Sequence, residues 1–305
     1  MKMIKTLIAA VMMLISSTAL MAQNPVFAQD VHSMNTDVYV LVGNFDFVRP
    51  DNGPLDGWGR SHKPDKPNGS RNETIRDEWD YVNPMLDTFY EHLEAARRIR
   101  TKDIQTESEL RSFVSSCPLP VYALEGKILK MESVTRYDDR RVMESLSARL
   151  EVKYRVINLK TNTLVKEFST SSSGFKSGKN ASLNAAMSDA FSSATHTIIT
   201  NLNDLFPTYG TVIQLAETKN GNQAKAVYVD VGSNQGLTTS NHFYVYEMTS
   251  VAGRQMSNRI GKLKVTSVGG PDISLCKVQS GGDKIFSAMK AGRTLYVESY
   301  TGFWE

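Results

Sequence analysis

The hydrophobic positions of this chain follow two periods, one typical of strands and one typical of helices. The sharpest alternation runs through residues 147–156, where apolar and charged side chains take turns. A period of two predicts a strand with one buried face and one wet face. Residues 158–162 are typical of a turn, and residues 163–170 then return as a partner strand. We therefore expect a β-hairpin here.

Other segments upstream of residue 205 complete an αβ pattern. Residues 37–48 and 119–134 are apolar enough for strands, the first of them buried on both faces. Apolar residues recur at helical spacing in residues 83–96, which begin with a capping Asn83, and in residues 180–205, where Asn180 is the expected cap. Residues 49–73 hold four prolines and four glycines and predict a long loop.

The pattern changes after residue 210 to short β-rich pieces separated by glycine turns. Several short strands at regular spacing predict a small barrel or sandwich. We expect residues 226–231 and 242–246 to be neighbouring strands, because Gly232 and Gly236 between them let the chain reverse.

The first residues indicate export. Lys2 and Lys5 precede an apolar run from Leu7 to Leu20, and small residues follow, which is the pattern of a secretory signal peptide. A cut is expected after Ala22, and Ala28 offers a second candidate. A bacterial lipoprotein has a cysteine directly after the apolar run, and this chain has none there. We therefore expect the mature protein to be soluble and unlipidated.

Charge and composition exclude several function classes. The formal charge is +3, and removing Lys2 and Lys5 leaves +1, which is too balanced for a nucleic-acid protein. We expect no cofactor and no metal, since two distant cysteines and five scattered histidines show no ligand spacing. Cys117 and Cys276 either form a disulfide between the two domains or remain buried thiols. We found no catalytic signature and expect no enzyme.

Residues 227–247, followed by residues 260–278 with Ile260-Gly-Lys-Leu263 and a final strand reading GRTLYV, resemble the C-terminal domain of flagellar assembly protein T. Upstream, the strand VYVLVGNFDF, the EGKI piece at residues 125–128, the hairpin and the alanine-rich last helix resemble the curli-assembly transport component family, the penicillin-binding-protein activators and the TolB N-terminal domain. These resemblances imply a bacterial protein with an envelope-assembly role, located in the periplasm and peripheral to the outer membrane at most. Curli-type transporters are lipoproteins with membrane-inserted hairpins, whereas here residues 135–145 and 169–179 are charged or rich in serine.

We therefore predict an α+β protein in three parts. These are a signal peptide (1–22), a layered αβ domain with a mixed sheet and packed helices (36–205), and a small all-β barrel or sandwich (209–304). The favoured function is a non-catalytic envelope assembly or scaffold factor that binds other envelope proteins, without stable membrane insertion. The alternatives are a subunit of a curli-type secretion channel and an envelope glycan or peptide hydrolase. The candidate partner contacts are Trp58, Arg60, Arg149, Lys153 and Arg155.

Overall fold

The structure of this protein is a computed structural model, which describes Phe27 and residues 30–47, 70–74, 89, 92–93, 98–138, 140, 142–178 and 181–301. The chain divides into two compact units. Among the described residues, the first unit takes those from 39 to 95 and from 100 to 199, and the second takes Phe27 and residues 30–38, 98–99 and 200–301. The predicted signal peptide, Trp58 and Arg60 lie outside the described residues. In the described part of the chain, no helix is both long and apolar enough to cross a membrane.

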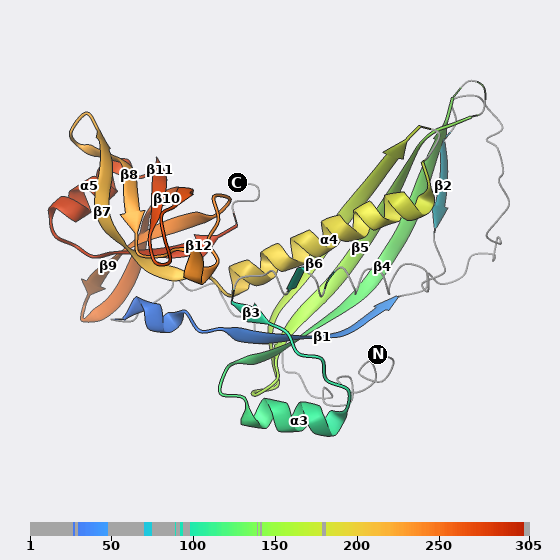
Figure 1. Cartoon of the computed structure of the whole chain (residues 1–305), viewed down its shortest axis with the longest axis horizontal. Coiled ribbons are helices and arrows are strands. Elements are labelled where there is room, and N and C mark those ends of the chain that lie inside the picture. Colours follow the sequence, from blue (N-terminus) through green and yellow to red (C-terminus); the bar gives the residue numbers. More distant parts are fainter. Residues whose placement is uncertain are drawn as a thin grey trace. The chain divides into compact units, whose positions relative to one another are not determined.

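The first unit is built on a mixed sheet with a long helix along it (Figure 1). Its strands are β1 (Val38–Phe47), β2 (Ser70–Thr74), β3 (Ile99–Arg100), β4 (Val121–Tyr137), β5 (Met143–Asn158) and β6 (Thr163–Ser177). The order is β3-β1-β4-β5-β6, and β2 also pairs with β4. Strand β1 runs parallel to β4, while β4–β5, β5–β6 and β2–β4 are antiparallel. The prediction of a loop over residues 49–73 is thus wrong at its end, because residues 70–73 belong to β2.

The predicted hairpin and the alternation in β5 are both confirmed. Residues 148, 150, 152, 154 and 156 are buried, while Arg149 and Lys153 are exposed. The side-chain oxygen of Asn158 accepts hydrogen bonds from the amides of Lys160 (2.9 Å) and Thr161 (3.2 Å), which closes the turn.

The long helix α4 (Leu183–Leu205) packs on the apolar face of this sheet, as its spacing predicts. Its buried side chains include Ala186, Met187 and Ala190. Small residues on both partners bring the backbones close: a Cβ at Gly174 would lie 1.9 Å from the carbonyl oxygen of Ala186. The cap is supplied by Ser182, whose hydroxyl accepts a hydrogen bond from the amide of Ala185 at 3.2 Å. The expected cap, Asn180, lies outside the described residues.

A short helix that the sequence analysis missed, α3 (Glu107–Ser116), covers a small cluster that includes Leu110 and Cys117. Its start carries a capping signature. The Thr106 hydroxyl accepts from the amide of Glu109 at 3.2 Å, and the Glu109 carboxylate accepts from the amide of Gln105 at 3.0 Å. The expected helix at residues 83–96 is described only at residues 89, 92 and 93, which are helical, and Phe89 is fully buried.

The second unit is a closed, six-stranded antiparallel barrel (Figure 1). Of the two predicted alternatives, the barrel is therefore confirmed and the sandwich is wrong. Its strands are β7 (Tyr209–Lys219), β8 (Gln223–Val229), β9 (His242–Val251), β10 (Arg254–Val268), β11 (Ser274–Ser280) and β12 (Leu295–Tyr300). Valines and other apolar side chains from all strands fill the interior. Helix α5 (Gly282–Lys290), which was not expected, adds Ile285 and Ala288 to this core.

One prediction about the barrel is wrong. Strands β8 and β9 are not neighbours, because the ring order is β10-β11-β8-β7-β12-β9. The connection between them contains a short turn, η2 (Ser233–Gln235), that packs against the β10–β11 connection. The amides of Ser233 and Asn234 donate to the carbonyls of Gly270 (3.0 Å) and Pro271 (2.9 Å). A Cβ at Gly232 would lie 2.3 Å from the Gly270 oxygen, so this glycine allows a close approach instead of a hairpin turn.

Candidate functional site

The outer surface of the barrel carries a group of aromatic side chains across three adjacent strands. In β9, Phe243 and Val245 point into the core, so Tyr244 and Tyr246 point outward. The same alternation in β12 turns residues 296, 298 and 300 outward, and Tyr209 begins β7 beside them. We call this surface the aromatic face and define it as Tyr209, Tyr244, Tyr246, Tyr296 and Tyr300 around Glu298.

Strand pairing sets the order of these side chains. Tyr246 lies opposite Tyr296, and Tyr244 lies opposite Glu298, which in turn lies opposite Tyr209 on β7. His242 lies opposite Tyr300. Neighbouring strands are roughly 4.8 Å apart, so rings from β9, β12 and β7 contact one another.

A partly buried carboxylate, that of Glu298, sits at the centre of the face. The hydroxyl of Tyr246 donates to the Glu298 carboxylate at 2.9 Å. Burial raises the pKa of Glu298, while hydrogen bonds from Tyr246 and Tyr209 act in the opposite direction. Burial and the nearby Glu298 charge raise the pKa of Tyr209 to about 12. These tyrosines therefore stay neutral donors at physiological pH and hold the carboxylate in place.

The chain covers part of this face with its own N-terminal segment, which we define as Phe27 and residues 30–35. The Phe27 ring stacks on Tyr296 with centroids 4.8 Å apart, lies tilted against Tyr246 at 5.3 Å, and meets Tyr209 edge-on at 6.0 Å. It is only 7% exposed. Val31 is buried in the same cluster, and Met34 packs against it. A peptide segment with an aromatic side chain thus fits one half of the face.

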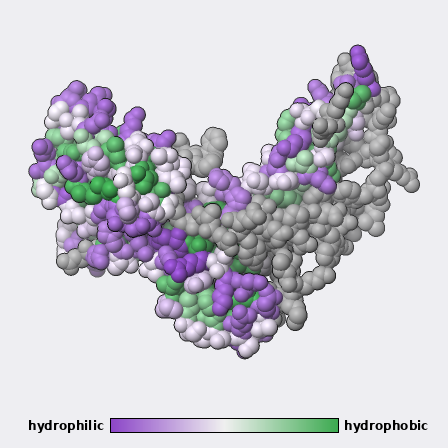
Figure 2. Space-filling view, viewed as in Figure 1, coloured by the Kyte–Doolittle hydropathy of each residue, from purple (hydrophilic) through white to green (hydrophobic). Residues whose placement is uncertain are grey.

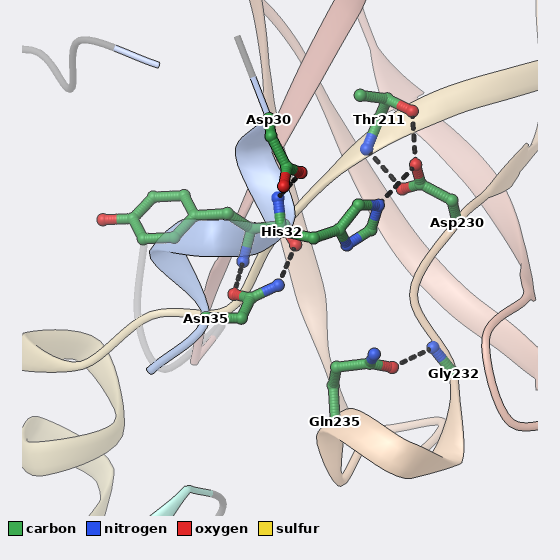
Figure 3. Close-up of polar contacts among 8 residues, drawn as sticks. Asp30, His32, Asn35, Thr211, Asp230, Gly232 and Gln235 are labelled. Carbon is green, nitrogen blue, oxygen red and sulfur yellow. Dashed lines mark hydrogen bonds and ion pairs between the residues drawn. The ribbon is translucent and has the colours of Figure 1, made fainter. Parts of the chain in front are cut away.

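Two polar contacts fix the end of this segment to the first barrel strand (Figure 3). The side-chain amide of Asn35 donates to the carbonyl of Tyr209 at 2.7 Å, and the amide of Tyr209 donates back to the Asn35 oxygen at 2.8 Å. This reciprocal pair satisfies a backbone donor and a backbone acceptor that no barrel strand satisfies at this position.

A histidine provides a second anchor (Figure 3). The Nε2 atom of His32 lies 3.0 Å from a carboxylate oxygen of Asp230, which also accepts from the Thr211 hydroxyl at 2.6 Å. The amide of Thr211 donates to the other oxygen of Asp230 at 2.5 Å. The Asp30 carboxylate accepts from the amide of His32 at 3.1 Å and caps the short turn η1 (Val31–Met34).

Arg98 binds the backbone at the end of the segment. Its guanidinium donates to the carbonyls of Pro207 and Thr36 at 2.5 Å each, and to the Asn35 side-chain oxygen at 3.2 Å. Burial lowers the pKa of Arg98, but its guanidinium stays charged because arginine is strongly basic. Arg98 therefore links the segment to the strand that follows α4.

The other half of the face, at Tyr244 and Tyr300, keeps partial exposure. The two rings stack with centroids 3.9 Å apart and 9° between their planes. On the opposite side of β9, the Arg259 guanidinium lies 4.6 Å and the Lys262 ammonium 5.7 Å from the Tyr244 centroid. His242 meets Tyr300 at 5.5 Å. Tyr244 thus lies between a ring from one neighbouring strand and cations from the other.

Hydropathy alone does not reveal this face. Figure 2 shows apolar side chains reaching the surface of the barrel unit among hydrophilic ones. Exposed apolar residues of the barrel include Ile213, Val251 and Met256. Tyrosine has an apolar body and a polar tip, so a group of tyrosines has intermediate hydropathy.

The three described partner contacts predicted from the sequence lie together on the outer side of β5, in the first unit. Lys153 pairs with Glu167 at 2.8 Å. Arg155 donates through two nitrogens to one oxygen of Glu125, at 3.0 and 2.9 Å. Arg149 lies opposite Glu132 on β4. Acids on adjacent strands therefore neutralise much of this row, and its role in partner binding stays a prediction.

The two cysteines are free thiols and both are buried, so the disulfide alternative is not what the structure shows. Cys117 belongs to the small cluster under α3, and Cys276 belongs to the barrel core. Burial raises the pKa of the Cys276 thiol to about 12, so this group is neutral and unreactive. Each thiol is thus part of the apolar packing of its own unit.

A hollow of about 450 Å³ beside α3 is a second candidate site. Its lining includes Lys102, Glu109 and Phe113 together with several serines. Lys102 lies 4.4 Å from the Phe113 centroid, and the Glu109 carboxylate is engaged in the cap of the helix. These charges serve local structure, so the aromatic face is the stronger candidate.

Comparisons with known proteins found similar solved structures only. No family model matches the chain, and no curated protein matches it. Similar solved structures include hypothetical protein CT253 from Chlamydia trachomatis, with 11% identity over 56% of this chain and 98% of that chain, at a TM-score of 0.33. Protein XCC0632 from Xanthomonas campestris, of family DUF330, has 14% identity over 60% and 89%, at 0.29. A Helicobacter pylori protein described as a candidate neuraminyllactose-binding hemagglutinin homolog has 11% identity over 60% and 91%, at 0.33. At these scores the similarities say nothing about activity.

Proposed function

We propose that this chain is a non-catalytic assembly or scaffold factor of a bacterial cell envelope, exported to the periplasm, whose barrel binds segments of other envelope proteins. The observation that carries the proposal is the burial of Phe27 on the aromatic face. A segment of this same chain already binds there through a ring and a few polar anchors, which is how exposed aromatic surfaces recognise peptides.

The composition of the face supports binding over catalysis. Tyrosine and arginine are enriched in the energetically important parts of protein interfaces, because they combine large contact area with directed hydrogen bonds. The described ionisable group at the centre, Glu298, is hydrogen-bonded by Tyr246 and held by neighbouring rings. Its role is therefore to orient the tyrosines. The predicted signal peptide and the resemblance to envelope-assembly families support the proposed location in the periplasm.

A pull-down with matched variants tests this function. Tyr300→Ser removes a ring of the aromatic face, whereas Tyr228→Ser removes a half-buried tyrosine of β8 on another side of the same barrel. Each variant and the unmodified chain are used to capture proteins from periplasmic extract, and the captured proteins are quantified by mass spectrometry. Circular dichroism checks that both variants fold.

We expect one or more envelope proteins to be captured by the unmodified chain and by Tyr228→Ser but lost with Tyr300→Ser. Equal capture by both variants would place binding elsewhere on the molecule. If no envelope protein exceeds background, the proposed function is wrong.

A further inference from the structure

The barrel fills its interior without the N-terminal segment. The apolar cluster inside the barrel takes its residues from the strands, the connections and helix α5, and none from the segment. Phe27 and Val31 belong instead to a separate cluster on the outside, together with Tyr246. Local elements with few core contacts detach at a lower free-energy cost than the core itself. The segment is therefore attached to the outside of a barrel whose core is complete without it.

The polar groups that hold the segment are fixed by the barrel itself. The Asp230 carboxylate accepts from the hydroxyl of Thr211 at 2.6 Å and from its amide at 2.5 Å, so these two contacts orient it without His32 (Figure 3). The hydroxyl of Tyr246 is likewise held by Glu298 at 2.9 Å. Groups that are already in position bind a ligand at a smaller entropic cost. This part of the aromatic face is therefore preformed for binding.

The segment in turn keeps its shape through contacts within itself. The Asp30 carboxylate accepts from the amide of His32 at 3.1 Å, and the Asp30 carbonyl accepts from the hydroxyl of Ser33 at 2.6 Å. The amide of Asn35 donates to the carbonyl of His32 at 2.9 Å. These bonds form a short turn with its own N-terminal cap, and none of them depends on the barrel.

Four side chains of the segment contact the barrel at a fixed spacing. Phe27 lies on the tyrosine rings, and Val31, four positions later, is buried in the same cluster. His32 follows directly and pairs with Asp230 at 3.0 Å. Asn35 then exchanges two hydrogen bonds with the backbone at the start of β7. The face thus binds an aromatic residue followed by a capping residue at +3, an aliphatic residue at +4, histidine at +5 and asparagine at +8.

We infer that the partner of the proposed function carries a segment with this same pattern and binds in place of the N-terminal segment. This inference rests on the proposed function and names the chemistry of its partner. The attached segment competes with the partner, because its tether keeps it at a high effective concentration beside the face. Tyr300 supports the same site through Tyr244, which packs against the Phe27 cluster and stacks on Tyr300 at 3.9 Å.

Fluorescence anisotropy on the full chain tests whether the face accepts such a segment from another molecule. The probe is a fluorescein-labelled peptide with the sequence of residues 24–36, NPVFAQDVHSMNT. Three comparison peptides carry Phe27→Ala, His32→Ala or a scrambled order. The proteins are the unmodified chain and Phe27→Ala, the latter also combined with Asp230→Asn or with the control Tyr228→Ser on β8. Circular dichroism checks that each variant folds.

We expect the probe to bind the Phe27→Ala chain at least about tenfold more tightly than the unmodified chain, whose own segment occupies the face. On the Phe27→Ala chain, the Phe27→Ala peptide should bind at least about 30-fold more weakly than the probe. The His32→Ala peptide should bind about two- to fivefold more weakly. Asp230→Asn should remove this last difference, whereas Tyr228→Ser should leave it unchanged.

The pull-down from periplasmic extract connects this site with the partner. Phe27→Ala should increase the capture of the envelope proteins that the unmodified chain captures, because it frees the face. An excess of the probe peptide should displace these proteins, whereas the scrambled peptide should not.

Three results would overturn the inference. The first is binding of the probe to the Phe27→Ala chain no tighter than that of the scrambled peptide. The second is capture that neither Phe27→Ala nor excess probe changes, in which case the proposed function stands and the partner has different chemistry. The third is a dimer of the unmodified chain in light scattering that Phe27→Ala abolishes, because the occupant is then a second copy of this chain. Normal probe binding without any captured envelope protein would refute the proposed function, and the inference with it.

Discussion

Replacement of Phe27 by alanine tests whether the N-terminal segment is bound to the aromatic face as a separate, dissociable element. The ring is 7% exposed, and burying a phenylalanine side chain stabilises by about 1.5–3 kcal/mol. Its stacking on Tyr296 at 4.8 Å adds about 0.5–1.5 kcal/mol. We therefore expect Phe27→Ala to weaken docking of the segment by about 2–4 kcal/mol, which raises its detached fraction roughly 30- to 1,000-fold.

Hydrogen exchange can report this change at a single amide. The amide of Tyr209 donates to the side chain of Asn35, so its protection depends on the segment. The amide of Val265 donates to the carbonyl of Asn241 within the barrel and serves as an internal reference. We expect Phe27→Ala to speed exchange at Tyr209 by the factor above and to leave Val265 unchanged. Phe175→Ala, which removes a ring that is 59% exposed, is the matched control and should change neither rate.

Two outcomes would refute this reasoning. Unchanged exchange at Tyr209 would mean that Phe27 contributes little to docking. An equal loss of protection at Tyr209 and Val265 would mean that Phe27 stabilises the whole barrel. The segment would then not detach from the aromatic face independently of barrel unfolding.

Three further predictions concern other groups. Burial raises the pKa of the Glu298 carboxyl in the folded state, so the folded protein binds the carboxyl proton more tightly than the unfolded chain does. The stability that this proton contributes is lost as the pH rises from about 4 through the raised pKa. Denaturant titrations measure the free energy of unfolding of the native chain and of the Glu298→Gln variant. The native value minus the variant value should fall as the pH rises over that window. A difference that grows with pH would contradict this cause. Cys117 and Cys276 should resist iodoacetamide in the folded protein and both react in denaturant without reductant, as counted by intact mass, whereas a disulfide would block both. Because Phe27 is buried on the barrel, intact-mass analysis of the exported protein should show that it is retained, whereas cleavage after Ala28 would remove it.

Local patterns predicted the first unit well. The alternation in β5 and the six-turn apolar stripe of α4 are set by neighbouring residues in the sequence, so each element is visible without knowledge of its partners. Helix α3 is also visible in the sequence, because Thr106 and Glu109 form a local capping signature at its start.

The barrel order and the aromatic face depend on contacts between distant segments. A glycine-containing loop between two strands predicts a hairpin by default, but the loop after β8 is held by Gly270 and Pro271, more than 30 residues away. The alternation of tyrosines with valines in β9 and β12 could have indicated an outward aromatic row. Nothing local, however, indicates that β9 and β12 pair or that Phe27 reaches them.

Site-specific photo-crosslinking in living cells tests the central claim most directly. A benzophenone amino acid placed at position 300 lies on the aromatic face, and the same amino acid at position 228 lies on β8 of the same barrel. We predict that irradiation links position 300 to a defined envelope protein and that position 228 gives no such adduct. The same adducts at both positions, or none at position 300, would contradict it.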